Sequence, residues 1–458
     1  MRRRNNSFKN ILTLMILSII VAIGAFIYFS PIFEKKKPTV SFLNNGYWNA
    51  KDKLNIKLED ESGIKSYKIS FKVNDANIEV QNKVLESKQN KLSIDINSIK
   101  LDQNVKTIKL AVEAYDNSMW NLFRGNTTYK EFTLNIDRKR PLARVITNSY
   151  NIKRGGSAAV VVEVKDENLK EKYITFNDTY KFELIPYLKE GFYAAIIAWP
   201  VEVEFDQFDV VNLVAIDKAN NVTVSKVPLY IKDLKIKNDK LKISDNFINK
   251  VSIPVLQKSD MEIPSSNDEI FIKQNRFLRA KNVSTIRDES IKNMSKEMIN
   301  NFSINPFRRL SGSKTFAGFA EKREYFYEGQ KIDEAWHLGM DWASIKRAPV
   351  KISNGGTVIF NNYLGIYGNT AIIDHKLGLQ TLYAHTSKLN VQKGDEVRKD
   401  DNIANTGSTG AVFGDHLHFG VLVQGIEVNP IEWMDKSWIK TRILDILSEA
   451  KQEIRRSK

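Results

Sequence analysis

The sequence contains no cysteine. This absence excludes disulfide bonds, a cysteine nucleophile and a cysteine-ligated metal site, so any metal must be held by histidine and carboxylate side chains. Histidine is also scarce, with five residues in a chain of 458. A chain of this length predicts about three domains, and their stability must come from packed cores instead of covalent cross-links.

Charge is absent from residues 11–29. As a helix this run is about 28 Å long, close to the roughly 30 Å hydrocarbon core of a bilayer. Arg2, Arg3 and Arg4 precede it, and the positive-inside rule keeps such an end in the cytoplasm. We therefore expect a cytoplasmic tail at residues 1–10 and a transmembrane signal anchor at 11–33. The protein would be single-pass in the cytoplasmic (inner) membrane, with the rest of the chain in the periplasm or outside the cell.

A cleaved signal peptide is the alternative interpretation of the same segment. The apolar run is longer than the usual h-region of 7 to 15 residues, and Tyr28 to Pro31 offers no small-x-small cleavage site. These two features favour a retained anchor that attaches the protein to the cytoplasmic membrane.

The net charge is 69 − 54 = +15. A net positive charge favours association with anionic partners, such as lipid head groups, acidic wall polymers or nucleic acid. The basic residues are interspersed with acidic ones, as on an ordinary solvated surface, and no nucleic-acid-binding motif is found in the sequence. We therefore expect no nucleic-acid partner.

Short alternating strands are predicted between residues 38 and 233, for example at Leu54, Ile56 and Leu58. The segment also repeats: residues 60–71 match 166–176, and two A-x-D turns recur at a spacing of 101. The pattern resembles bacterial Ig-like modules and predicts two tandem β-sandwiches, at 38–137 and 141–233. The aspartates of these turns, Asp116 and Asp217, are expected to cap turns and not to bind calcium.

The rest of the chain divides into three segments. Residues 234–320 are polar and weakly patterned, which predicts a connector with a possible helix at 284–301. Residues 321–437 contain glycine-punctuated strands and predict a compact β-domain. Residues 438–458 predict a basic amphipathic helix that packs on a domain edge. The expected fold is therefore mostly β.

All five histidines lie within the 82 residues from His337 to His418. His416 and His418 begin a β-type run, and residues i and i+2 of a strand point to the same face. His337 and Asp341 are four residues apart, an even spacing that also places both on one face of a strand. These motifs indicate one site that collects several imidazoles and a carboxylate.

Two imidazoles and one carboxylate suit zinc, and a catalytic zinc site keeps three protein ligands and leaves a fourth position for water. His385 and the remaining member of the His416/His418 pair are then free to handle protons or a developing oxyanion. Such a site leaves no obvious catalytic or metal-binding role for His375. We therefore expect His375 to have a structural role.

The order H-x-x-x-D, Y-A-H and H-L-H-F resembles the LytM or lysostaphin-type zinc endopeptidases. The segments V-Q-K-G-D-E-V at 391–397 and G-S-T-G at 407–410 add to the resemblance, which covers roughly residues 315–435. It implies a duplicated-hybrid-motif β-sandwich with one Zn²⁺ per chain, held by His337, Asp341 and His418. It also implies that His385 and His416 are catalytic. The chain departs from the family's pattern at 399–404 and at Gly420. None of these positions is an expected metal ligand.

The resemblance implies a zinc metalloendopeptidase that hydrolyses peptide crosslinks or stem peptides of bacterial peptidoglycan during cell-wall remodelling. The alternative is a non-catalytic LytM-type regulator that binds the wall and activates an amidase. All five expected positions are filled here, which favours the enzyme. A D-Ala-D-Ala-type zinc carboxypeptidase is a third possibility, and the Y-A-H and H-L-H-F segments argue against it.

Overall fold

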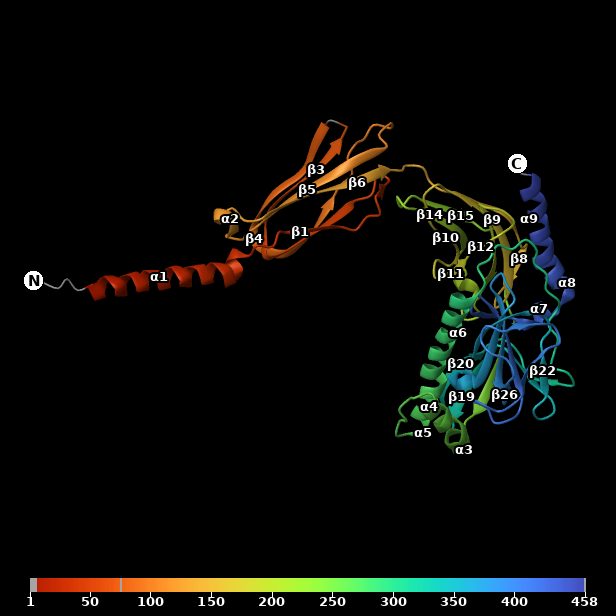
Figure 1. Cartoon of the computed structure of the whole chain (residues 1–458). Helices are drawn as coiled ribbons and strands as arrows, with labels where there is room; N and C mark the ends of the chain where they lie inside the picture. The colour runs from red at the N-terminus through yellow and green to blue at the C-terminus, as the bar shows by residue number, and fades with distance from the viewer. Residues whose placement is uncertain (1–5, 75, 457–458) are drawn as a thin grey trace, which may run out of the picture. The chain divides into compact units, whose positions relative to one another are not determined.

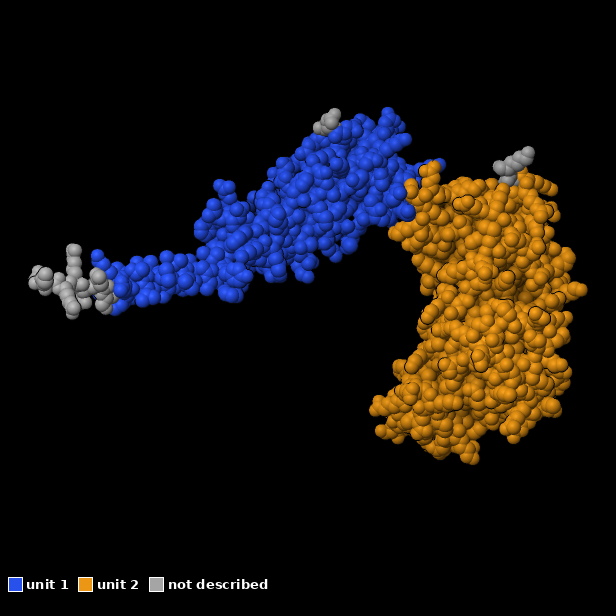
Figure 2. Space-filling view, viewed as in Figure 1, with its two compact units in different colours: residues 1–140, 216–221 blue, residues 141–215, 222–458 orange. Residues whose placement is uncertain are grey.

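Strands dominate the described residues, 6–74 and 76–456 of a computed structural model, which confirms the mostly-β prediction. Figure 1 labels the helices and strands along the chain. Contacts divide the chain into two compact units, which Figure 2 colours separately. The first unit contains residues 1–140 and 216–221, and the second contains residues 141–215 and 222–458.

The first unit begins with the apolar helix α1 (Asn6–Phe29). Its segment Phe8–Phe29 has a mean hydropathy of 2.7 and is not buried by the protein, so the helix is long and apolar enough to cross a membrane. A signal sequence has the same properties. Arg2, Arg3 and Arg4 lie outside the described residues, and the orientation of the helix remains a prediction.

A β-domain follows α1 and the 3₁₀ turn η1 (Pro31–Phe33). One six-stranded sheet has the order β1-β3-β5-β6-β2, with β4 paired to β3. Its core contains Ile56 and Leu58 on one face of β3, and the rings of Trp48 and Phe71 stack 5.4 Å apart. The Ig-like class of this domain remains a prediction. Its elements are β1 (Thr39–Phe42), β2 (Tyr47–Trp48), β3 (Leu54–Val73), β4 (Ala76–Ile96), β5 (Thr107–Asp116), α2 (Trp120–Phe123) and β6 (Thr127–Ile136).

A second β-domain contains two four-stranded sheets, β11-β10-β14-β15 and β12-β13-β9-β7, and the parallel pair β16-β8. Asp217 at the end of β14 accepts a hydrogen bond from the backbone N–H of Asn221, the turn capping predicted for it. The strands are β7 (Leu142–Asn148), β8 (Asn151–Lys153), β9 (Ser157–Lys165), β10 (Leu169–Phe176), β11 (Tyr180–Glu183), β12 (Ile185–Pro186), β13 (Phe192–Ala198), β14 (Val211–Asp217), β15 (Val222–Lys226) and β16 (Tyr230–Lys232).

The segment predicted as a connector is largely helical. It pairs β17 (Lys237–Lys242) with β19, and its helices pack on Ile372, Leu382 and Leu422 of the following β-domain. The predicted helix at 284–301 is wrong in its second half, because α6 ends at Asn293. Met294 is extended and the N–H of Ser295 bonds to Asp374 Oδ2. The helices are α3 (Asp245–Phe247), η3 (Ile248–Ser252), α4 (Ile253–Lys258), α5 (Asn267–Ile272), η4 (Lys273–Leu278) and α6 (Arg279–Asn293).

The C-terminal β-domain is built on an eight-stranded sheet of order β18-β21-β29-β25-β24-β23-β27, with β30 paired to β29. The glycine-punctuated strands predicted within residues 321–437 include β23, β24 and β25. The sheet contains β18 (Lys314–Ala317), β21 (Met340–Ala343), β23 (Gly356–Tyr363), β24 (Asn369–Asp374), β25 (Leu379–Thr386), β27 (Glu396–Val397), β29 (Leu417–Val423) and β30 (Ile426–Val428). Beside it lie β19 (Glu321–Tyr327), β20 (Gln330–His337), β22 (Pro349–Lys351), η5 (Gly365–Tyr367), β26 (Lys388–Leu389) and β28 (Asn402–Asn405).

The chain ends in α7 (Pro430–Met434), α8 (Lys436–Ile439), the π-helical turn η6 (Lys440–Leu444) and α9 (Asp445–Arg456). Residues 457 and 458 of the predicted amphipathic helix lie outside the described residues. Helix α9 buries its apolar face against β7 and β9 of the second β-domain, beside which it runs in Figure 1. One continuous hydrophobic core therefore joins the second β-domain, the C-terminal helices and the C-terminal β-domain.

Candidate metal centre

Neighbouring strands of the large sheet, together with the end of β20 from the adjacent three-stranded sheet, bring the predicted site residues together. Asp341 on β21 lies directly opposite His418 on the antiparallel strand β29, and His418 lies opposite Ala384 on β25. His385 follows Ala384 near the end of β25, and His337 is the last residue of β20. The register of the sheet therefore determines which side chains meet.

His337, Asp341 and His418 present their ligand atoms to one point. Nε2 of His337 is 3.1 Å from Oδ2 of Asp341, and Nδ1 of His418 is 2.9 Å from Oδ1 of the same carboxylate. The two imidazole nitrogens are 3.2 Å apart. The ligand atoms of the three residues all lie within 4.8 Å of one another, so one small cation can contact all of them.

The chemistry of these donors fits zinc. Nδ1 of His337 donates a hydrogen bond to the carbonyl oxygen of Gly318 at 2.7 Å. Because a carbonyl oxygen can only accept, the proton resides on Nδ1, and the lone pair of Nε2 faces the site. A hydrogen bond on the other ring nitrogen is the usual way in which a protein orients a metal-binding histidine. Nitrogen and carboxylate donors in this ratio are typical zinc ligands.

Two further histidines border the cluster. The ring of His385 is 4.9 Å from the ring of His416 and 5.8 Å from that of His418, between centroids. Nε2 of His416 is 3.8 Å from Oδ1 of Asp341. As predicted for residues i and i+2 of an extended segment, His416 and His418 both face Asp341.

Backbone carbonyl groups also fix the proton positions on these two rings. Nδ1 of His385 donates to the carbonyl oxygen of Thr409 at 2.9 Å, and Nδ1 of His416 donates to that of Gly414 at 2.8 Å. In both rings Nε2 is therefore the nitrogen that remains available for a substrate or a water molecule.

Burial and mutual proximity shift the pKa values of the site. Burial alone would raise the pKa of Asp341, yet His337 and His418 hold it well below its usual range. Burial lowers the pKa of His385 well below its usual value, and the neighbouring His416 and His418 lower it further. Burial also lowers the pKa of His418. Near neutral pH these shifts favour an ionised Asp341 beside neutral His385 and His418, and metal ligands need carboxylates and imidazoles in these forms.

The hydrogen-bond partners of His375 lie outside this cluster. Its Nδ1 bonds to the carbonyl oxygen of Gly355 and its Nε2 to the hydroxyl of Thr381, both at 2.8 Å. Burial lowers its pKa to about 4, so the ring is neutral. These contacts fit the structural assignment made from the sequence.

Three neighbours of the site were not singled out by the sequence. Tyr367 packs edge-on against His418, with ring centroids 5.7 Å apart. A guanidinium nitrogen of Arg323 is 3.7 Å from Oδ2 of Asp341. A Cβ on Gly339 would lie 2.5 Å from Nε2 of His418, so the glycine is required there. Only Gly339 carries a sequence signal, because it lies inside the H-x-x-x-D motif.

In comparisons with known proteins, the segment that contains this site matches a protein family. Residues 335–430 match Peptidase family M23. The chain is 38% identical over 107 residues to the DD-carboxypeptidase/endopeptidase Mpg of Neisseria meningitidis serogroup B, covering 23% of this chain and 25% of that protein. It is 35% identical over 116 residues to the peptidoglycan DD-endopeptidase ShyB of Vibrio cholerae, covering 25% and 26%. The chain thus spans about a quarter of the length of these curated relatives.

A solved structure matches a similar share of the chain. The catalytic domain of the antimicrobial peptidase lysostaphin from Staphylococcus simulans is 25% identical to it. The match covers 27% of this chain and 94% of that domain, with a TM-score of 0.24. The family match and the named relatives lead to one identification: the C-terminal part of the chain contains a peptidase M23 domain of the LytM/lysostaphin-like type.

Proposed function

We propose that the protein is a zinc-dependent endopeptidase that hydrolyses peptide crosslinks or stem peptides of bacterial peptidoglycan. The observation that carries the proposal is the convergence of three ligand side chains on one point of the M23 domain, with two further histidines beside them. Its relatives Mpg and ShyB are named as a DD-carboxypeptidase/endopeptidase and a peptidoglycan DD-endopeptidase.

In this proposal His337, Asp341 and His418 hold one zinc ion per chain. When bound, the ion supplies Lewis-acid polarisation of the scissile carbonyl and lowers the pKa of a water molecule to roughly 7. The Nδ1 hydrogen bond of His337 to Gly318 keeps its Nε2 directed at the site. Burial of the three side chains excludes bulk water and strengthens every electrostatic interaction there.

His385 and His416 act as the catalytic residues of the proposal. His385 is neutral near neutral pH, since burial depresses its pKa, and its Nε2 is free to accept a proton from the attacking water. His416 is the most exposed histidine of the site, on the side where a substrate must enter. Because its Nδ1 proton is held by Gly414, its Nε2 must first take up a proton, which it can then donate to the developing oxyanion or return to the leaving amine.

The remaining segments are assigned accordingly. Helix α1 anchors the protein in the cytoplasmic membrane with its N-terminus in the cytoplasm, and the M23 domain faces the wall. The two β-domains, at 38–137 and 141–233, belong to the Ig-like class and act as a spacer. Peptidoglycan is the partner outside the membrane. The retained set of five residues favours an enzyme over a regulator that activates an amidase.

The test is digestion of purified sacculi by the full chain in detergent, with released fragments identified by mass spectrometry. We expect crosslinked muropeptides to become shorter through cleavage of peptide bonds, with no increase in reducing sugar ends. New reducing ends would identify a glycan-cleaving activity instead. An absence of peptide cleavage on every sacculus preparation, with zinc bound, would favour the regulator.

A further inference from the structure

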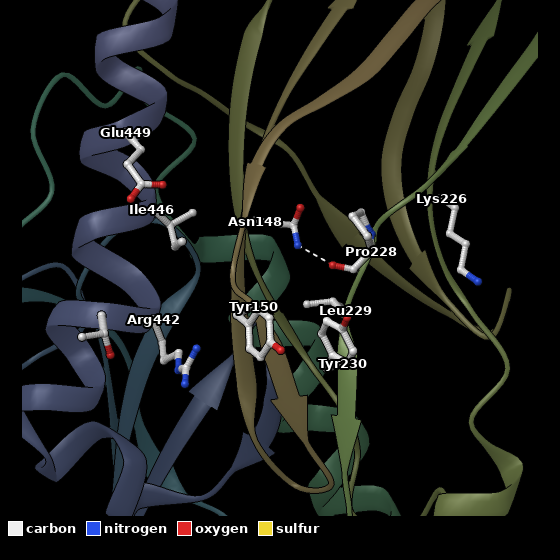
Figure 3. Close-up of a pocket in the computed structure, with 10 residues that line it drawn as sticks. Asn148, Tyr150, Lys226, Pro228, Leu229, Tyr230, Arg442, Ile446 and Glu449 are labelled. Atoms are coloured by element: carbon white, nitrogen blue, oxygen red, sulfur yellow. Dashed lines mark hydrogen bonds between the residues drawn. The ribbon is translucent and has the colours of Figure 1, made fainter.

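A groove on the second β-domain, far along the chain from the histidine motifs, has the properties of a ligand site. It lies between the strand pair β8-β16 and the C-terminal helices, and its volume is about 650 Å³, within the range of small-molecule sites. Figure 3 shows Tyr150 and Tyr230 at its centre, with Arg442 on the helix beside them. We call this feature the tyrosine groove and define it by Asn148, Tyr150, Lys226, Tyr230, Arg442 and Glu449.

Two exposed aromatic rings form the floor of the tyrosine groove. The rings of Tyr150 and Tyr230 stack with centroids 4.6 Å apart, and 60% and 65% of the two residues remain exposed. The backbone holds them in place, because the N–H of Tyr230 donates to the carbonyl oxygen of Tyr150 next to the paired strands β8 and β16. Single exposed aromatic residues are common, but a fixed and stacked pair inside a groove indicates a binding platform.

The helical wall of the groove is fixed as well. The guanidinium of Arg442 lies 5.9 Å from the ring centroid of Tyr150. Arg442 belongs to the π-helical turn η6, and its carbonyl oxygen accepts a hydrogen bond from the hydroxyl of Ser149 at 2.5 Å. One turn later, Thr147 donates to the carbonyl oxygen of Ile446. Short π-helical turns occur frequently at functional sites, and these bonds hold the wall against β7.

The chemistry of the groove favours a carbohydrate. Aromatic faces carry partial negative charge, which attracts the weakly positive C–H bonds on the flat face of a pyranose ring. Asn148, Arg442 and Glu449 surround the rings with groups that can bond to hydroxyl and acetamido groups. Two cations, Lys226 and Arg442, outnumber the single carboxylate of Glu449, which suits a neutral or anionic polymer. A peptide instead needs pockets for alternate side chains, whereas the tyrosine pair, with its rings stacked on each other, exposes a flat outer ring face.

We propose that the tyrosine groove binds the glycan strand of peptidoglycan, a chain of N-acetylated amino sugars with carboxylates on its lactyl groups. This inference rests on the proposed function, since it names a second contact with the same polymer. The groove and the M23 domain share one hydrophobic core. A strand held by the tyrosines is therefore presented to the metal centre by a rigid body, and binding raises the local concentration of its peptides.

The test measures binding to glycan strands from which an amidase has removed the stem peptides. Full-length protein in detergent is sedimented with this material, and Tyr150→Ala, Tyr230→Ala and Tyr230→Phe are compared with the parent. We expect each alanine variant to bind about 5- to 10-fold more weakly, since one ring face is lost. Tyr230→Phe should bind nearly as the parent does. Tyr129→Ala, at an exposed tyrosine outside the groove, is the matched control.

The outcomes separate this inference from the proposed function. Cleavage of a soluble crosslinked peptide without sugars should be unchanged in the tyrosine variants, while cleavage of intact sacculi should fall. Glycan binding remains measurable even if no peptide bond is ever cut. Equal glycan binding by the parent and both alanine variants overturns the inference. Displacement of the protein from glycan by the sugar-free peptide also overturns it, in favour of a peptide-binding groove.

Discussion

His385 has a backbone φ of 61°, in the left-handed region that residues with a side chain seldom occupy. Such strained conformations occur mainly at functional sites, where the surrounding structure maintains them. Here the strand partner β29 and the hydrogen bond to Thr409 hold the ring beside His416. The strain therefore supports the role proposed for His385, because an unstrained strand end would direct the ring elsewhere.

Substitution should separate the metal-binding residues from the catalytic ones. His337→Ala, Asp341→Ala and His418→Ala each remove one of three proposed ligands, so these variants should purify with little zinc and no activity. His385→Ala and His416→Ala should keep about one zinc ion per chain and lose roughly 10² to 10⁴-fold in rate. Metal analysis beside rate measurements on crosslinked muropeptides distinguishes the two groups.

His375→Ala is the control for these variants. It should retain zinc and the activity per folded molecule, while its thermal midpoint falls, since the hydroxyl of Thr381 and the carbonyl of Gly355 lose their buried partner. Zinc lost from His416→Ala but kept in His418→Ala would show that the roles of the pair are reversed.

Glu432 predicts a pH dependence of stability. Burial raises its pKa to about 7 from an ordinary 4.5, although its Oε2 accepts a hydrogen bond from the N–H of Ser157. Below pH 4.5 the carboxyl is protonated in both the folded and unfolded states. Between pH 4.5 and 7 only the unfolded state ionises, so stability falls as the pH rises. The full loss above pH 7 is on the order of 3 kcal/mol, since each unit of pKa difference corresponds to about 1.4 kcal/mol.

Glu432→Gln removes this titration and keeps an oxygen that can accept from Ser157. The variant should melt at the same temperature as the parent at pH 4 and several degrees higher at pH 8, measured by calorimetry. Glu453→Gln, at an exposed position on α9, should behave as the parent at both values. A stability difference of the same size at pH 4 and pH 8 would contradict the assignment.

Strand periodicity explains the pairing of His416 and His418. It does not explain that of His337 and Asp341, because the structure places these two residues on separate strands, β20 and β21, and not on one face of a single strand as predicted. His416 and His418 alternate with Leu417, and the register of β29 then places His418 against Asp341. The partners that orient the rings could not be predicted, since they are backbone carbonyl groups of Gly318, Thr409 and Gly414, which have no side-chain signature. The burial of Glu432 could not be predicted either, because it depends on a contact with a strand that is distant in the sequence.

At the scale of elements, the strands of the M23 domain were predicted best, because glycines bound them and apolar residues run through them. The helices at 245–293 were largely missed. Their apolar residues pack on the sheet and on one another in short α- and π-helical pieces, so no single period of 3.6 residues spans the segment. The end of α6 was misplaced because Asp374, 79 residues away from Ser295, ends the helix there.

Helix α6 should stabilise the metal centre through Asn282. This buried side chain accepts a hydrogen bond from the N–H of Ile366 at 2.9 Å, in the turn η5 whose last residue, Tyr367, packs on His418. Asn282→Ala leaves the N–H of Ile366 without its partner and should cost about 1 to 3 kcal/mol of stability. The loosened turn should lower the rate roughly 10-fold at unchanged zinc content.

Ser284→Ala, at an exposed position of the same helix, is the matched control and should change neither property. Thermal unfolding, zinc analysis and the peptidase rate are measured for both variants. A normal rate in Asn282→Ala would show that η5 is positioned by the sheet alone.

At the scale of the molecule, the second β-domain and the M23 domain are packed around one shared core, so we expect them to fold together. Tyr187 donates a hydrogen bond to the carbonyl oxygen of Leu447, and the indole of Trp433 donates to Ser157, both across their common core. The sequence predicted separate domains here. The two strand patterns are distinct, and no periodicity in either reveals that their apolar faces meet.

Truncated fragments test whether the second β-domain and the M23 domain stabilise each other. A fragment of residues 141–458 should unfold in one transition at nearly the temperature of the same part of the full chain. A fragment of residues 315–458 loses the β-sheets that cover α9 and Trp433, so it should unfold at a much lower temperature or aggregate. Calorimetry and light scattering report the two results. Equal melting temperatures of both fragments would show that the shared core contributes little.

The shared core also bears on how such proteins recombine in evolution. A gene segment that encodes only residues 335–430 carries every proposed metal ligand, but in this chain it would lack both the C-terminal helices and the strands on which they pack. We therefore expect residues 141–458 to be inherited as one unit, and recombination between genes to be tolerated best near residue 140. Close homologues with exchanged N-terminal parts should therefore keep the second β-domain with the peptidase and vary in what precedes it.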